Sequence, residues 1–216
     1  MRLRNIPRAN ETIEIHPAVI KKPEERIGHW KQVFGNTNPI YIEIGMGKGQ
    51  FLLCMAQKYP NINFIGIERY PSVMLRAVER LDTEEFHGME NIRFICMDAR
   101  DINVVFAPDE VDRIFLNFSD PWPKARHARR RLTSKEFLER YEKIMIQGGQ
   151  IEFKTDNTIL FNFSLDQIKE AGWKLQYYTY DLHHHTAMMQ DNVMTEYEVK
   201  FSGQGNPINK LIAVRK

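Results

Sequence analysis

Short apolar runs alternate with helical patterns along most of the chain, and this alternation limits the possible folds more than any other feature. Runs rich in β-branched residues predict strands at residues 40–44, 62–67, 92–97, 113–118 and 150–154. Helices are predicted at 50–59, from Pro71 to before Gly88, from Thr133 to Gly148-Gly149, and from about Thr158 to Gly172. Strands that alternate with helices pair in parallel, so we expect a mostly parallel sheet with helices on both faces.

The pattern changes after Gly172. Residues 173–180, 195–201 and 210–214 have the composition of strands with no helix between them, which predicts an antiparallel edge. The third predicted helix begins with Thr133-Ser134-Lys135-Glu136, a capping-box pattern. A chain of 216 residues with 43% hydrophobic residues can bury one core, so residues 1–216 are expected to form a single domain. Residues 1–35, with seven Lys/Arg against four Glu, are expected to form a basic extension that is flexible without RNA.

Glycines and acids follow the predicted parallel strands. Ligands bind at the carboxyl ends of the strands in such sheets, so the residues just after each strand are the candidates for chemistry. They are the glycine loop Gly45-Met46-Gly47-Lys48-Gly49, then Glu68, Asp98, Asp120 and Asp156. This arrangement predicts one binding site along the edge of the sheet where the strands end.

The glycine loop differs from a dinucleotide-binding loop. Its spacing is G-x-G-x-G, and Gln50 stands where the last glycine of G-x-G-x-x-G would meet a pyrophosphate. Glu43 precedes the loop and would repel a pyrophosphate but suit a cation. Glu68 suits the hydroxyls of a ribose, and Asp98 follows the strand beside which an adenine would lie. These features resemble those of the class I S-adenosylmethionine methyltransferases, over roughly residues 40–201.

A second motif follows the fourth predicted strand. Asp120-Pro121-Trp122-Pro123-Lys124 leads into Arg126-His127-x-x-Arg130-Arg131-Leu132, so residues 124–131 hold five Lys/Arg and no acid. This segment, with Lys154-Thr155-Asp156 and Thr195-x-x-Glu198, resembles the bacterial tRNA (guanine-N7-)-methyltransferase family. Where that family often has two further lysines, this chain has Ala125 and Arg129.

The resemblance implies a Rossmann-like class I methyltransferase fold with a seven-stranded sheet, and a role for each matching residue. S-adenosylmethionine would be the cofactor, bound by Glu43, Gly45, Glu68, Asp98 and Asp120, and Asp120 would be the catalytic residue. The substrate guanine, in the variable loop of tRNA at position 46, would be bound by Lys124, Asp156, Thr195 and Glu198. RNA would be contacted by Arg126, His127, Arg129, Arg130 and Arg131.

The expected chemistry needs few groups. Guanine N7 is a free lone pair at neutral pH, so neither a general base nor a covalent nucleophile is required, and positioning should supply most of the catalysis. A carboxylate, Asp120 or Asp156, would stabilise the cationic product. A carboxylate could also accept both N1–H and N2–H of guanine; Asp156 and Glu198 are the two candidates. The cluster of Lys and Arg is expected in an exposed loop where it would contact RNA phosphates.

Two other motifs are interpreted as structural. Trp122 between two prolines is expected to pack rather than to stack on a base. His183-His184-His185 are assigned to a loop, because three consecutive side chains do not easily converge on one ion, and no metal is expected. Only Cys54 and Cys96 occur, and no apolar run is long enough to span a bilayer. The prediction is a cytoplasmic protein that acts on tRNA, as a monomer or a homodimer, without an obligate protein partner or membrane attachment.

Three other functions would share part of this pattern. A methyltransferase for exocyclic amines is close, because Asp-Pro-Trp-Pro is similar to the Asp-Pro-Pro-aromatic loop of those enzymes. An NAD-dependent oxidoreductase would share the sheet and Glu68, but would not explain Gln50 or the arginines. An RNA-binding module without a cofactor would leave Glu43, Glu68 and Asp98 without a function.

Overall fold

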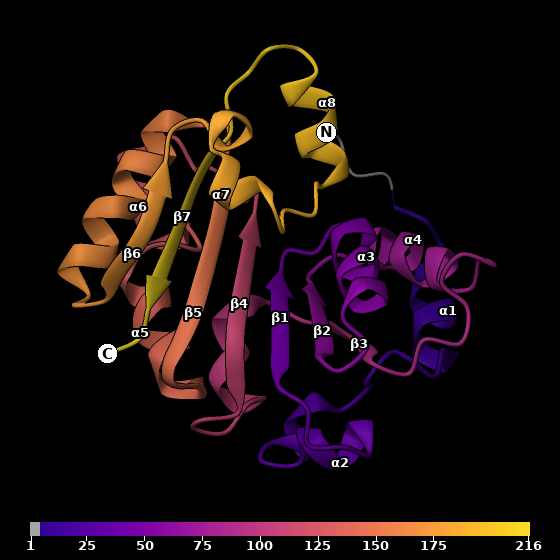
Figure 1. The fold of residues 1–216 in the computed structure, drawn as a ribbon. Coiled ribbons are helices and arrows are strands. Elements are labelled where there is room, and N and C mark those ends of the chain that lie inside the picture. Colours follow the sequence, from indigo (N-terminus) through magenta and orange to yellow (C-terminus); the bar gives the residue numbers. More distant parts are fainter. Residues whose placement is uncertain (1–4) are drawn as a thin grey trace.

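The computed structural model describes residues 5–216, and these residues form a seven-stranded sheet with helices on both faces (Figure 1). The strand order is β3-β2-β1-β4-β5-β7-β6. The strands are β1 (Ile40–Ile44), β2 (Asn63–Glu68), β3 (Ile92–Cys96), β4 (Val111–Asn117), β5 (Met145–Thr155), β6 (Lys174–Thr179) and β7 (Asn209–Val214). Strands β1 to β5 pair in parallel, whereas β7 is antiparallel to both β5 and β6. The predicted fold class is therefore confirmed.

Two layers of helices cover the sheet because its strands are apolar on both faces. On one face, α1 (Ala9–Ile15), α3 (Gln50–Lys58) and α4 (Pro71–Leu81) pack on a core that includes Phe64 and Phe115. On the other face, α2 (Trp30–Phe34), α5 (Lys135–Ile144) and α6 (Thr158–Glu170) pack on a second core that includes Ile42 and Ile114. Every residue of β2 is buried, as expected for a central strand covered on both sides.

Residues 182–202 lie across the edge of the sheet where the parallel strands end, and we call them the cap. It contains a 3-10 helix (Leu182–His184), α7 (Thr186–Met189) and α8 (Glu196–Ser202), drawn in yellow at the top of Figure 1. Leu182 and Met188 form a small buried cluster with Ile208, against which Phe118 packs. No helix in residues 5–216 is both long and apolar enough to cross a membrane.

The structure corrects the strand predicted at residues 195–201, which is helix α8. Tyr197, Val199 and Phe201 alternate with charged residues, and this spacing imitates a strand. The capping box decides the outcome: the Glu198 N–H donates to Thr195 Oγ1, and the Glu198 carboxylate accepts the Thr195 N–H. In the helix the Tyr197 and Phe201 rings stack with centroids 4.0 Å apart.

The predicted capping box at Thr133 does not form. The Thr133 hydroxyl instead lies 2.6 Å from the Ser164 hydroxyl, and Ser134 is the N-cap residue of α5 without a side-chain capping bond. The helix also ends at Ile144 rather than at Gly148-Gly149, because β5 already begins at Met145.

Residues 5–35, part of the expected basic extension, pack against the rest of the chain in this structure. Ala9 and Ile13 of α1 are buried against α4. Val19 forms a parallel bridge with Phe94, and the fully buried Trp30 donates from Nε1 to the Val105 carbonyl. Residues 1–4 of the predicted extension lie outside the described part of the chain.

Candidate active site

A cavity of about 760 Å³ lies where β1 to β4 end. It brings together predicted site residues from four separate segments of the chain, namely Gly45, Glu68, Asp98, Asp120, Arg129 and Arg130. Other predicted residues do not line it: Glu43, Lys124, Arg126, His127, Arg131, Asp156, Thr195 and Glu198. The cavity therefore unites the predicted cofactor residues, except Glu43, with part of the basic cluster.

The glycine loop is fixed by its backbone conformation and by Glu68. Gly45, Gly47 and Gly49 all have positive φ, and a Cβ on Gly49 would come within 2.7 Å of the Ala77 Cβ. The Gly47 N–H donates to Glu68 Oε2 over 3.2 Å, and the Tyr70 N–H donates to Glu68 Oε1 over 3.0 Å. Burial raises the pKa of the Glu68 carboxyl above its ordinary value.

Asp98, which follows β3, is held by Arg100. Its carboxylate accepts from the Arg100 backbone N–H and from the Arg100 guanidinium, at distances of 2.9 to 3.0 Å. The hydrogen bond from the Arg100 side chain is the main reason why the pKa of Asp98 is lowered. Asp98 is therefore a fixed anion at the tip of β3.

Glu43 lies beneath the glycine loop and is only 2% exposed. Asn117 Nδ2 donates to Glu43 Oε1 over 2.8 Å, but Glu43 Oε2 and Asn117 Oδ1 have no hydrogen-bond partner within residues 5–216. Burial raises the pKa of Glu43 to about 8. Two buried acceptors without donors, next to a glycine loop, fit a ligand that brings a cationic donor such as an ammonium group. This geometry is compatible with the cofactor that the resemblance implies.

The Asp120 loop is held in a strained conformation. Phe118 and Trp122 have φ of 50° and 42°, a region that residues other than glycine rarely adopt. Arg131 Nε donates to the Pro121 carbonyl over 2.9 Å and Arg131 Nη2 to the Trp122 carbonyl over 3.1 Å. Arg131 is itself buried, with its guanidinium 4.3 Å from the centre of the Phe163 ring. It fixes the loop from behind, while Asp120 is exposed at the cavity.

The basic cluster is a 3-10 helix (Ala125–Arg130) rather than the expected loop. Lys124, Arg126, Arg129 and Arg130 are exposed on it, whereas Arg131 points inward. Trp122 is half-buried and packs against this helix, with its ring 5.1 Å from the Arg130 guanidinium and 5.7 Å from the His127 ring. Trp122 thus packs against the 3-10 helix and also lines the cavity.

Asp156 and Glu198 have different surroundings. Asp156 is half-buried at the end of β5, where its carboxylate accepts from the Tyr197 hydroxyl over 3.3 Å. The Tyr197 ring lies 4.6 Å from the ring of Phe118, which lines the cavity. Glu198 is fully buried and forms an ion pair with Lys154 over 2.6 Å, and Thr195 is buried as the N-cap of α8.

Sequence analysis missed Tyr197, Asn117, His183 and Asn192, all of which contact a predicted site residue. The signal for Asn117 was a polar residue at the end of an apolar strand, directly before the Asp120 loop.

The three consecutive histidines reach different partners: His183 Nε2 is 3.0 Å from Glu198, His184 Nδ1 is 2.7 Å from Asp181, and His185 caps α7. Their side chains diverge.

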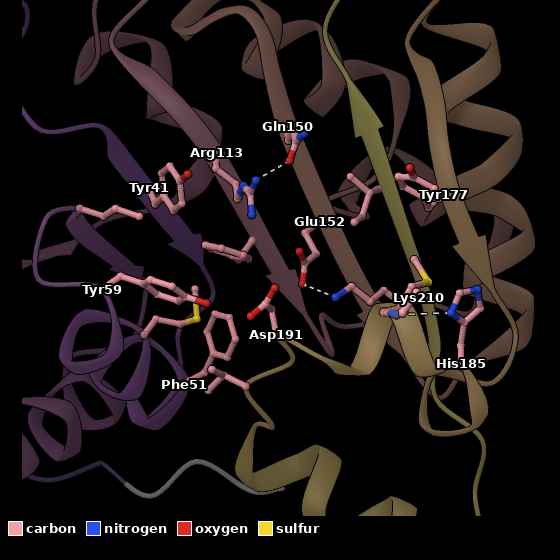
Figure 2. A pocket seen from close by; sticks show the side chains of 17 residues that line it. Tyr41, Phe51, Tyr59, Arg113, Gln150, Glu152, Tyr177, His185, Asp191 and Lys210 are labelled. Carbon is pink, nitrogen blue, oxygen red and sulfur yellow. Dashed lines mark hydrogen bonds and ion pairs between the residues drawn. The ribbon is translucent and has the colours of Figure 1, made fainter.

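A second cavity, of about 490 Å³, lies on the sheet face between α3 and α7 (Figure 2). Several of its polar groups bond to one another: Arg113 donates to the Gln150 amide oxygen over 2.5 Å, and Lys210 forms an ion pair with Glu152 over 2.9 Å. Asp191 and His185 of the cap lie at one end of this cavity. The cavity at the strand ends has the chemistry of an active site, and the second one extends beneath the cap.

Comparison with known proteins places the chain among methyltransferases. A family model described as "Putative methyltransferase" matches residues 37–211. A protein from Lachnoclostridium phytofermentans, named tRNA (guanine-N(7)-)-methyltransferase, is 55% identical over 216 residues, which is 100% of this chain and 99% of that protein. A protein of the same name from Lysinibacillus sphaericus is 52% identical over 212 residues, 98% of this chain and 96% of that protein.

Solved structures agree on the fold at low identity. The 16S rRNA methyltransferase KamB superposes with a TM-score of 0.65 at 13% identity, covering 88% of this chain and 93% of that one. The 16S rRNA (adenine(1408)-N(1))-methyltransferase of Catenulisporales acidiphilia, solved with its cosubstrate SAM, has a TM-score of 0.59 at 14% identity. It covers 89% of this chain and 91% of that one. At such identities the likeness concerns the fold.

Proposed function

The chain belongs to the tRNA (guanine-N7-)-methyltransferase family, and we propose on this basis that the cavity at the strand ends is its active site. There the methyl group of S-adenosylmethionine is transferred to N7 of a tRNA guanine, the variable-loop guanosine at position 46. The observation that carries this proposal is the meeting of Gly45, Glu68, Asp98 and Asp120 with the arginines of the 3-10 helix Ala125–Arg130 in one cavity.

The bound cofactor supplies an electrophilic methyl group on a cationic sulfur. Transfer of this methyl group would break its carbon–sulfur bond as the carbon–N7 bond formed, so the positive charge would pass to the base and no proton would leave. Because N7 needs no deprotonation, the protein mainly positions the base and stabilises the moving charge. Asp120 is the proposed catalytic residue, exposed at the cavity on a loop that Arg131 holds rigid.

Each proposed cofactor residue is assigned to the part of S-adenosylmethionine that its surroundings suit. Glu43, with its free buried oxygen, accepts the ammonium group of the amino-acid part, together with Asn117. Glu68 accepts the ribose hydroxyls, and its bonds from the Gly47 and Tyr70 N–H groups orient it for this. Gly45 allows close approach of the backbone, and Asp98 faces the adenine.

On the substrate side, Asp156 is the proposed reader of the guanine edge. Its half-buried carboxylate can accept N1–H and N2–H together, whereas the Glu198 carboxylate is fully buried. Lys124, Arg126, Arg129 and Arg130 are exposed and suit RNA phosphates, with His127 beside them. Arg131 acts by holding the Asp120 loop, and Thr195 acts by capping α8.

The decisive experiment is incubation of the protein with unmodified tRNA and labelled S-adenosylmethionine, followed by nucleoside analysis. We expect N7-methylguanosine as the product. A matched tRNA that carries 7-deazaguanosine at position 46 has a carbon in place of N7 and should stay unlabelled there. Label on an exocyclic amine, or undiminished labelling of the deaza substrate, would contradict the proposal.

A further inference from the structure

The buried Glu198 carboxylate has no free hydrogen-bonding capacity. It accepts from Lys154 Nζ over 2.6 Å, from Asn192 Nδ2 over 2.8 Å, from His183 Nε2 over 3.0 Å, and from the Thr195 N–H over 3.4 Å. A carboxylate offers about four acceptor positions, so these donors use them. With its side chain 0% exposed, Glu198 cannot receive N1–H and N2–H of a base in this arrangement.

Lys154 is satisfied in the same way. Its ammonium donates to Glu198 Oε2, to Asn192 Oδ1 over 3.2 Å and to the Val193 carbonyl over 2.9 Å. These are the three donors that an ammonium group has. The Lys154 side chain is also 0% exposed, so the ion pair is closed to solvent, whereas the His183 side chain is 24% exposed.

The network joins the cap to the centre of the sheet. Lys154 stands on β5, next to β4, whereas His183, Asn192, Val193 and Glu198 all belong to the cap. The cap also contacts the rest of the protein through the apolar cluster of Leu182 and Met188 and through Tyr197, which reaches Asp156 and Phe118. At its edge, Glu196 pairs with Arg80 over 2.5 Å. Figure 2 shows the cap residue His185 beside Lys210 of β7, and Asp191 between Phe51 of α3 and Glu152 of β5. Among these contacts, the Lys154–Glu198 ion pair attaches the cap through two fully buried charges.

The attachment determines the position of Tyr197. This residue precedes Glu198 on α8 and is 40% exposed. Its hydroxyl donates a hydrogen bond to the Asp156 carboxylate, and its ring packs against the Phe118 ring. A shift of α8 would separate Tyr197 from Asp156 at once. Apolar side chains could fill the same space, but they would not fix the direction of the helix as hydrogen bonds do.

We propose that Lys154, Glu198, His183 and Asn192 are positioning residues that hold the cap across the strand ends and set Tyr197 against Asp156. Glu198 acts through this network and does not touch the base. The inference rests on the proposed function, because it assigns the effect of the network to the binding of the tRNA guanine at Asp156.

The test compares Glu198→Gln, Lys154→Met and the double variant in the full chain. Each single variant leaves one buried partner uncompensated, while the double variant removes both charges. We expect each single variant to raise KM for tRNA at least tenfold, with the affinity for S-adenosylhomocysteine within threefold of wild type. The double variant should return KM to within about threefold of wild type. Glu139→Gln, an exposed glutamate on α5, is the matched control and should keep the wild-type KM.

The opposite result is equally clear. If the double variant regains the thermal unfolding temperature of the wild type but keeps the KM of Glu198→Gln, Glu198 contacts the substrate and the proposal is overturned. Should a single variant fail to fold, the double variant is compared with wild type directly, and the same two outcomes decide. Formation of N7-methylguanosine by the wild type tests the proposed function separately, since it does not depend on any variant.

Discussion

Two buried glutamates near the ends of the strands, Glu43 and Glu198, differ in how many hydrogen bonds their carboxylates accept. Glu43 at the end of β1 has one hydrogen bond and one free oxygen, and burial raises its pKa to about 8. Glu198 beside the end of β5 is surrounded by donors. Burial alone would raise the pKa of Glu198, but Lys154, His183 and Asn192 outweigh it and the pKa is lowered.

One lysine explains the difference. Lys154 affects both carboxylates, but its ammonium donates to Glu198, Asn192 and Val193, so Glu43 receives only its longer-range attraction. Protein donors satisfy the Glu198 carboxylate, whereas Glu43 Oε2 has no donor within residues 5–216. The first arrangement suits a structural attachment, and the second suits a ligand site.

The largest expected effect is on stability. Glu198→Gln leaves the Lys154 ammonium buried without its anion, which costs about 3–5 kcal/mol. Glu43→Gln should cost less than about 1 kcal/mol at pH 7, because a carboxyl with a pKa of about 8 is already mostly neutral there. Urea unfolding at pH 7 measures both losses. Equal losses would remove the distinction between the two glutamates.

The next effect concerns Asp120, which lies between the two regions. Asp120→Asn removes the charge that faces the developing cation, so kcat should fall about 10²- to 10³-fold. KM for tRNA should change little. The control is Asp166→Asn, an exposed acid on α6, which should retain the wild-type kcat. A kcat within threefold of wild type for Asp120→Asn would exclude this role.

A third prediction uses the raised pKa of Glu43. Its proton must leave when a cationic group binds, so affinity for S-adenosylmethionine should increase as pH rises, up to about tenfold between pH 6 and 7. The increase should level off above the pKa of about 8. Stability of the free protein should change in the opposite direction. A carboxyl whose pKa is raised on folding favours the folded state below its unfolded pKa of about 4.5 and loses this effect as pH rises through 8.

Calorimetry and thermal unfolding across pH 5–9 test both parts of this prediction. Glu43→Gln serves as the control, and its affinity and stability should lack this pH dependence. An unchanged pH profile in Glu43→Gln would mean that another group, such as Glu68, releases the proton.

The smallest effect belongs to the exposed cations. With Lys124, Arg126, Arg129 and Arg130 exposed and Arg131 buried, log affinity for tRNA should fall with log salt at a slope of about −3. Arg126→Ala should reduce that slope by about 0.8 and weaken binding only severalfold. Arg131→Ala should instead lower kcat, because the Asp120 loop loses its two hydrogen bonds. Filter binding at several salt concentrations separates the two arginines, and equal slope changes would contradict the assignment.

The sequence alone determined the order of strands and helices from β1 to α6, the glycine loop and the strand ends at which the cavity lies. These features follow from local rules: apolar periodicity selects helix or strand, and parallel strands end at the same edge of a sheet. Glu68 is the last residue of its strand, and Gly45, Asp98 and Asp120 follow theirs within a few residues, so their meeting in one cavity could be predicted without contacts.

Only the tertiary structure decided which charged residues are buried. Arg130 and Arg131 are adjacent and chemically identical, yet one is exposed and the other fixes the Asp120 loop. Lys154 and Glu198 are 44 residues apart, and their pairing depends on α8, whose sequence also has the alternation of a strand. The burial of a charge depends on neighbours that are distant in the chain, and local pattern carries no information about them.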